Sequence, residues 1–195
     1  FMEHITDLNR ERNQQIITQA KDINTLLLKN NITPIFLKGA GNLLAGLYDD
    51  IAERMVGDID ILFSMDDYPK AVTILRDNSY LPQKKYDYKH LPHRHYPRLI
   101  KKNNIGAVEI HSKFLNSKYD SEFNYGFVKK DIQIIGAAVL SYANKLNLSI
   151  VASQINDSGF YYKAIPLRNA YDVFLLSKKT SAKDAVNSLD TLNDP

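Results

Sequence analysis

The segment "GDIDILF", residues 57–63, carries two aspartates inside a run of apolar residues. Alternate side chains of a β-strand share one face, so Asp58 and Asp60 point one way while Ile59 and Ile61 point into the core. Neighbouring carboxylates repel each other, and a divalent cation between them removes that repulsion. Oxygen ligands without cysteine favour Mg²⁺ or Mn²⁺ over zinc, and Mg²⁺ held by carboxylates and substrate phosphates is typical of phosphoryl-transfer sites.

A third carboxylate lies in "VEIH", where Glu109 stands between two apolar residues of another predicted strand. A lone acid in an apolar strand needs a partner, and a metal shared with Asp58 and Asp60 would supply one. Carboxylates on adjacent strands can hold two metals, one activating an attacking hydroxyl and one holding phosphates. His111 shares the strand face of Glu109, which suggests proton transfer or orientation of Glu109; a structural, hydrogen-bonded histidine is the alternative.

A glycine-rich turn, "FLKGAG", precedes these acids and contains Lys38, Gly39, Ala40 and Gly41. Its glycines would let backbone amides approach a phosphate closely. A helix that follows would offer its N-terminus to the same anion, and Lys38 would add a positive charge. The spacing of a Walker A loop is absent.

These motifs together resemble an uncharacterised nucleotidyltransferase family of the polymerase β-like superfamily. The similarity covers "LKGAGNLLAGLY", Arg54, "GDIDILF" and "VEIH", and it continues more weakly into "LRNAYDVFLLSKK". The resemblance implies transfer of a nucleoside monophosphate from an NTP, ATP among the candidates, to an acceptor hydroxyl with release of pyrophosphate. The acceptor is open: RNA, a protein side chain or a small molecule.

The resemblance also assigns roles to individual residues, with Mg²⁺ or Mn²⁺ as cofactor. Asp58 and Asp60 match the metal pair, and Glu109 matches the third acid. Residues Lys38 to Gly41 match the phosphate-binding turn, and Arg54 matches a basic position near the phosphates. The superfamily often has serine where this chain has Ala40, so one hydroxyl contact to a phosphate is missing.

Each feature also has a simpler interpretation. The aspartates would be solvated if their strand had one wet face. Glu109 would pair with a lysine or arginine, and Arg54 would pair with Glu53 or Asp50. At the level of function, the alternatives are a catalytically weak or inactive binding or regulatory module of the same fold, and another metal-dependent phosphoryl-transfer enzyme such as a phosphodiesterase.

The region 84–102 is basic and rich in tyrosine and histidine. It suggests nucleic-acid binding by charge and stacking, with a plain solvated face as the alternative. Its histidines, His90, His93 and His95, are better explained as polar surface or substrate-groove residues than as a zinc site.

Composition sets the remaining bounds. The chain has 195 residues, no cysteine, 44% hydrophobic residues and a net charge of +3, which alone is too weak to indicate nucleic acid. No apolar run reaches membrane-spanning length, so we expect a cytoplasmic protein without a membrane partner.

The order of predicted elements indicates an α+β fold, a small mixed sheet flanked by helices with a helical C-terminal part. Helices are expected at 12–29, 40–50 and 66–78, and strands at 34–39, 58–63, 80–88, 93–100 and 105–114. The pattern turns helical after residue 120, with helices at 142–155 and 166–179 and a short one after Ser181. We expect residues 1–130 to form the nucleotidyltransferase core with its N-terminal helix and residues 131–195 to form a helical part packing on it.

Overall fold

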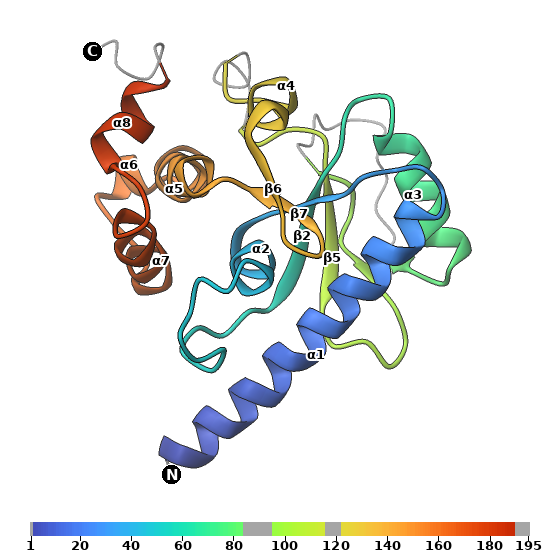
Figure 1. The fold of residues 1–195 in the computed structure, drawn as a ribbon. Helices are drawn as coiled ribbons and strands as arrows, with labels where there is room; N and C mark the ends of the chain where they lie inside the picture. Colours follow the sequence, from blue (N-terminus) through green and yellow to red (C-terminus); the bar gives the residue numbers. More distant parts are fainter. Residues whose placement is uncertain (1, 84–94, 116–121, 190–195) are drawn as a thin grey trace. The chain divides into compact units, whose positions relative to one another are not determined.

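The computed structural model describes residues 2–83, 95–115 and 122–189. The chain divides into two compact units. Unit 1 comprises residues 1–112 and 134–139, and unit 2 comprises residues 113–133 and 140–195. The fold is α+β, as the sequence predicts (Figure 1). No described helix is both long and apolar enough to cross a membrane.

A mixed sheet has the strand order β3-β4-β5-β2-β1-β7-β6. Its strands β2 and β5 run parallel, as do β1 and β7, whereas β1–β2, β3–β4 and β4–β5 are antiparallel. The bounds are β1 Ile35–Phe36, β2 Asp58–Leu62, β3 Leu81–Pro82, β4 Leu99–Ile100, β5 Ala107–His111, β6 Ile132–Ile134 and β7 Ala138–Leu140.

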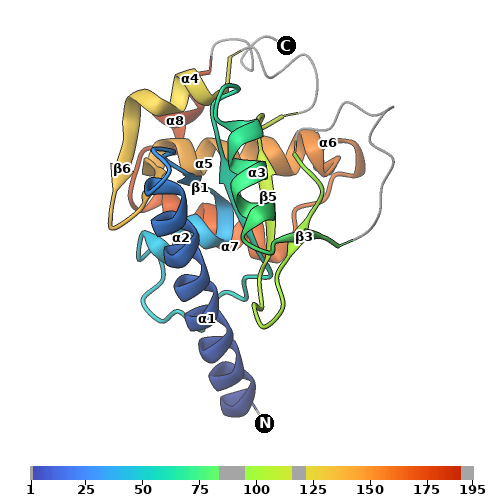
Figure 2. The same ribbon diagram turned by 90° about the vertical axis from the view of Figure 1, so that its right-hand side faces the viewer.

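The helices described in unit 1 are α1 (Met2–Leu28), α2 (Lys38–Leu44) and α3 (Tyr68–Asp77). Apolar residues of α1 recur at helical spacing and are fully buried, so this stripe packs on the core. Ile16 of the stripe approaches Ile59 of β2, which places α1 on the sheet face opposite the aspartates. The N-terminal end of α1 extends well beyond the rest of unit 1, and α3 lies next to β5 (Figures 1 and 2).

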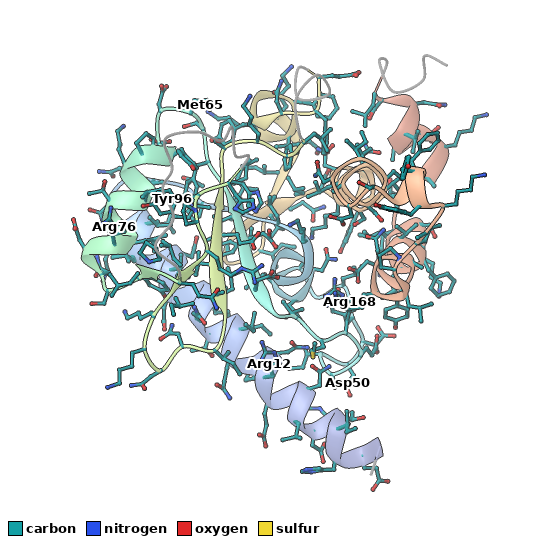
Figure 3. The ribbon with its side chains drawn as sticks, turned by 180° about the vertical axis from the view of Figure 1, so that it is seen from behind. Arg12, Asp50, Met65, Arg76, Tyr96 and Arg168 are labelled. Carbon is teal, nitrogen blue, oxygen red and sulfur yellow. The ribbon has the colours of Figure 1, made fainter. Side chains whose placement is uncertain are left out.

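Polar side chains of α1 bind the backbone just before β2, which carries the aspartates, and just before β5, which carries Glu109. Arg12 Nε donates to the carbonyl of Val56 at 2.9 Å, two residues before β2. Figure 3 shows Arg12 part-way along α1, on the side of unit 1 where the loop that carries Asp50 runs. Gln19 both donates to the carbonyl of Gly106 at 2.8 Å and accepts from its N–H at 2.9 Å, directly before β5. A surface helix thus fixes where the two strands begin.

Unit 2 is mainly helical, with α4 (Tyr125–Val128), α5 (Tyr142–Val151), α6 (Gly159–Tyr162), α7 (Leu167–Ser177) and α8 (Ala182–Asn187). Side chains cap three of these helices in the expected manner. Ser141 accepts from the N–H of Asn144 at the start of α5, and Ser181 caps α8 in the same way. A π-helical turn, Ala152–Asn156, continues α5.

Several expectations about local structure are wrong. Helix α1 begins at Met2 instead of residue 12, α2 ends at Leu44 instead of residue 50, and the strand expected at 93–100 is reduced to β4. The predicted strand 34–39 shrinks to β1, and α2 begins at Lys38, so the glycines lie in a helical turn instead of following a strand end. The stretch after residue 120 is not wholly helical, because it includes β6 and β7. Each of these strands has three residues, too few to show a period of two against a helical background.

Candidate functional site

The parallel register of β2 and β5 brings the predicted acids together. Asp60 lies directly opposite Glu109, and the pairs two residues away are Asp58 with Ala107 and Leu62 with His111. Since side chains alternate along both strands, the acids and His111 share one face of the sheet. A slip of one residue would turn Glu109 and His111 to the other face. The register therefore builds the cluster.

Asp60 is the most enclosed carboxylate of the cluster, with 2% of its surface exposed. Lys38 Nζ donates to its Oδ1 at 2.5 Å, and His111 Nε2 lies 2.7 Å from the same oxygen. Burial by itself raises the pKa of the Asp60 carboxyl, but the Lys38 ammonium and the bond with His111 outweigh burial and hold it well below its usual range. Asp60 is therefore ionised at neutral pH.

Glu109 is paired with Arg98, a residue directly before β4. Arg98 Nε donates to Glu109 Oε1 at 2.9 Å, and Nη2 donates to the same oxygen. Burial raises the pKa of Glu109, but the His111 imidazole and the Arg98 guanidinium lower it to about 2. The interpretation that Glu109 pairs with an arginine or lysine thus describes its contacts in this structure.

Asp58 stands apart from its neighbours because its charge is poorly compensated. Its side chain is 38% exposed, and Arg98 Nη2 lies 3.3 Å from its Oδ2. Burial raises the pKa of Asp58 above its ordinary value, and the negative charges of Asp60 and Glu109 raise it further. A cation placed beside these carboxylates would reverse that effect.

The donor set fits a divalent cation. One ligand atom each from Asp60, Glu109 and His111 lies within 4.8 Å of the others, and Asp58 is on the same strand face. Carboxylate oxygens in this number suit Mg²⁺ or Mn²⁺, and the histidine nitrogen lies where it can bind a metal or support a ligating carboxylate.

The glycine-rich segment forms the first turn of α2, close to Asp60. The positive φ belongs to Lys38, at +47°, and not to a glycine. Gly41 is needed for close packing, since an added Cβ would lie 2.5 Å from the carbonyl oxygen of Phe36. A Cβ on Gly39 would lie 3.0 Å from Val56 Cγ2. Both glycines therefore have a packing reason, in addition to any contact with phosphate.

Arg54 lies over the same turn. Its Nη1 donates to the carbonyl of Met55 at 2.8 Å and would be 3.3 Å from a Cβ on Gly39. Asp50, one of the surface partners that the sequence suggests for Arg54, is bound instead by Arg10 at 2.7 Å. Ala40 is buried, with 1% of its surface exposed.

Arg98 is the residue that sequence reasoning missed. It was visible only as one charge in the basic region 84–102, and its reach to Glu109 depends on the pairing of β4 with β5. Residues 84–94 of that region, including His90 and His93, lie outside the described residues, so the nucleic-acid prediction stays a prediction. His95 packs against the site, with its ring 5.2 Å from that of His111.

Comparisons with known proteins bear on the fold and on the family of the chain. The antibiotic-resistance factor ANT(2'')-Ia, solved in solution, has a similar fold at a TM-score of 0.56, with 11% identity over 92% of this chain and 91% of that chain. At that identity the likeness shows the fold alone. No curated protein sequence matches the chain. A family model described as "Uncharacterised nucleotidyltransferase" matches residues 2–193. Because that match spans nearly the whole chain, the protein belongs to this nucleotidyltransferase family.

Proposed function

We propose that the protein is a metal-dependent nucleotidyltransferase that moves a nucleoside monophosphate from an NTP to an acceptor hydroxyl. The α-phosphorus forms a bond to the acceptor oxygen, its bond to the β-phosphate oxygen breaks, and pyrophosphate leaves. The observation that carries the proposal is the convergence of Asp58, Asp60 and Glu109 on one face of two paired strands. Family membership makes NMP transfer the general expectation.

In this proposal Asp58 and Asp60 hold Mg²⁺ or Mn²⁺ together with Glu109. A bound divalent cation supplies charge neutralisation and lowers the pKa of an attacking hydroxyl. Glu109 also takes the acceptor's proton. Its pKa of about 2, lowered by the His111 imidazole and the Arg98 guanidinium together, makes it a weak base, so that task needs these contacts to weaken.

The nucleotide phosphates would meet the first turn of α2. The first amides of a helix have no acceptor within it, and Gly39 and Ala40 occupy such positions. Lys38 adds a positive charge on the site side, since it already reaches Asp60. Arg54, stacked over Gly39, supplies a second cation near the same turn. His111 holds Asp60 in place through its bond of 2.7 Å.

One further observation favours a second candidate, a binding or regulatory module without turnover. Lys38 already pairs with Asp60, and Arg98 pairs with Glu109. A module that has lost its cation would need such partners, and the missing hydroxyl at Ala40 points the same way.

Labelled NTPs separate the two candidates. Wild type and Asp58→Asn are incubated with each labelled NTP, Mg²⁺ or Mn²⁺ and cell extract, with a parallel series in EDTA. We expect metal-dependent transfer of label to one class of acceptor by wild type, and none by Asp58→Asn. Nucleotide binding by calorimetry without any transfer of label or release of pyrophosphate would favour the module instead.

A further inference from the structure

Arg98 binds one oxygen of each of two proposed cation ligands. Its Nε and Nη2 bind Oε1 of Glu109, and Nη2 also lies 3.3 Å from Oδ2 of Asp58. These two residues are among the proposed cation ligands. In this structure the guanidinium therefore supplies positive charge to two of the carboxylates that would hold a metal.

A guanidinium and a divalent cation compete for these carboxylates. Both are positive, and in a partly buried site their repulsion is weakly screened. The Arg98 side chain is 47% exposed, so solvent borders it and its long stem can carry the charged group outward at small cost. Lys38 differs, because its partner Asp60 has 2% of its surface exposed and is bound by His111 as well. Arg98 is the partner that must leave.

The chemistry of the guanidinium indicates where it goes. Its planar donors match carboxylates and phosphates equally well, often through two bonds at once. A triphosphate attached to cations on Asp58 and Glu109 would bring phosphate oxygens to the side chain that those carboxylates have released. The same donors can then exchange one anion for another without a change of fold.

We propose that Arg98 is a nucleotide-phosphate ligand, kept on Glu109 and Asp58 until these carboxylates take up their cation and then transferred to the triphosphate. This inference rests on the proposed function. It gives Arg98 two effects of opposite sign: Arg98 competes with the cation before nucleotide binds, and it supports the nucleotide afterwards. A salt bridge with a purely structural task would not weaken cation binding while strengthening nucleotide binding.

Calorimetry on Arg98→Gln measures both effects. The first titration uses Mn²⁺ alone with EDTA-treated, dialysed protein. The second uses each of the four NTPs with Mn²⁺-saturated protein. We expect Arg98→Gln to bind Mn²⁺ more tightly than wild type, by roughly threefold or more, because a competing charge is gone. We expect its NTP affinity to fall about 10–100-fold, the usual effect of losing a hydrogen bond to a charged group.

Two other variants make the test specific. Arg98→Lys keeps the positive charge but loses the planar donors of the guanidinium, so the changes in Mn²⁺ affinity and in NTP affinity should have the same direction and a smaller size. This variant replaces Arg98→Gln if that protein fails to fold. Arg76→Gln removes the same charge from the exposed face of α3, labelled in Figure 3, and should leave both affinities unchanged.

Several outcomes would overturn the inference. Weaker Mn²⁺ binding by the Arg98 variants would show that Arg98 organises the carboxylates for the metal. Unchanged NTP affinity would remove its phosphate contact. In both cases the proposed function stands as long as wild type binds Mn²⁺ and NTP. If wild type and Arg76→Gln bind no Mn²⁺ either, the proposed function fails and the inference fails with it.

Discussion

Replacing Asp60 by asparagine tests what holds the acids together without metal. From the sequence alone, adjacent carboxylates repel, and removing one would relieve that repulsion. The structure shows two compensating contacts, Lys38 at 2.5 Å and His111 at 2.7 Å, and a pKa of Asp60 held below its usual range. The attraction therefore outweighs the repulsion, and we expect Asp60→Asn to destabilise the EDTA-treated protein.

The size of the loss follows from the burial of the partners. Removing one partner of a buried ion pair costs ~3–5 kcal/mol. Lys38 is 35% exposed and can regain water, and an asparagine oxygen can still bind His111, so the loss should be smaller, about 2 kcal/mol. For a chain of this length that corresponds to a fall in Tm of roughly 4–8 °C. Urea and thermal unfolding in EDTA at pH 7 measure both quantities.

The pH dependence adds a second check on Asp60. A carboxyl whose pKa is lowered in the folded state stabilises the protein above its unfolded pKa, near ~3.9, and loses that contribution as the pH falls through the folded value. The gap between wild type and Asp60→Asn should therefore stay constant from pH 7 to about 4 and shrink below. Asp77→Asn, at an exposed position of α3, is the matched control. An Asp60→Asn protein as stable as wild type would refute the reasoning, because repulsion would then dominate.

Four further substitutions test three other features. Gly41→Ala should lower stability by about 1–3 kcal/mol because its Cβ would meet the Phe36 carbonyl at 2.5 Å. Gly39→Ala should lower stability less because the Val56 side chain can shift. Urea unfolding compares the two variants, and equal losses of stability would contradict the packing argument. Burial lowers the pKa of Lys145 to about 8, whereas in the unfolded chain its pKa is ~10.4, so the buried charge destabilises the folded protein below pH 8. Lys145→Met should therefore be more stable than wild type at pH 7 by roughly 2–3 kcal/mol, and this difference in stability should close by pH 10. A difference in stability that does not depend on pH would exclude the titration of Lys145 as its cause. In Asp58→Asn, Mn²⁺ affinity measured by calorimetry should fall at least about tenfold while the Tm in EDTA changes little, since Asp58 is poorly compensated; unaltered affinity would remove Asp58 from the ligand set.

The sequence is informative about the site wherever a local rule applies. Alternation along "DIDIL" and "AVEIH" is enough to assign Asp58, Asp60, Glu109 and His111 to polar strand faces, and the structure has these strands within a few residues of the predicted bounds. No local feature of the sequence specifies the register in which β2 pairs with β5. That Asp60 faces Glu109 depends on two strands that pair in parallel across a long connection.

The other features that the sequence does not predict also depend on contacts between distant parts of the chain. Arg98 reaches Glu109 because β4 pairs with β5, and no feature of the segment around Arg98 encodes that partner. The run "PIFLKG" is apolar and short, so its pattern does not separate a strand from the start of a helix. The backbone turns at Lys38, which takes the positive φ although a glycine stands next to it. Contacts with Asp60 stabilise that conformation, and they are non-local as well.

Because helix α1 contacts a residue far along the chain, completion of the site depends on the order in which the chain is synthesised. The helix leaves the ribosome before the strands that it contacts, yet Gln19 must wait for Gly106, 87 residues further along the chain. At translation rates of about 5–20 residues per second, that interval lasts roughly 4–17 s. During this interval Gln19 cannot yet bind Gly106 at the start of β5, and Glu109 does not yet lie opposite Asp60 in the sheet. A nascent chain stalled before this point would carry both aspartates without the partner strand that turns them into a site.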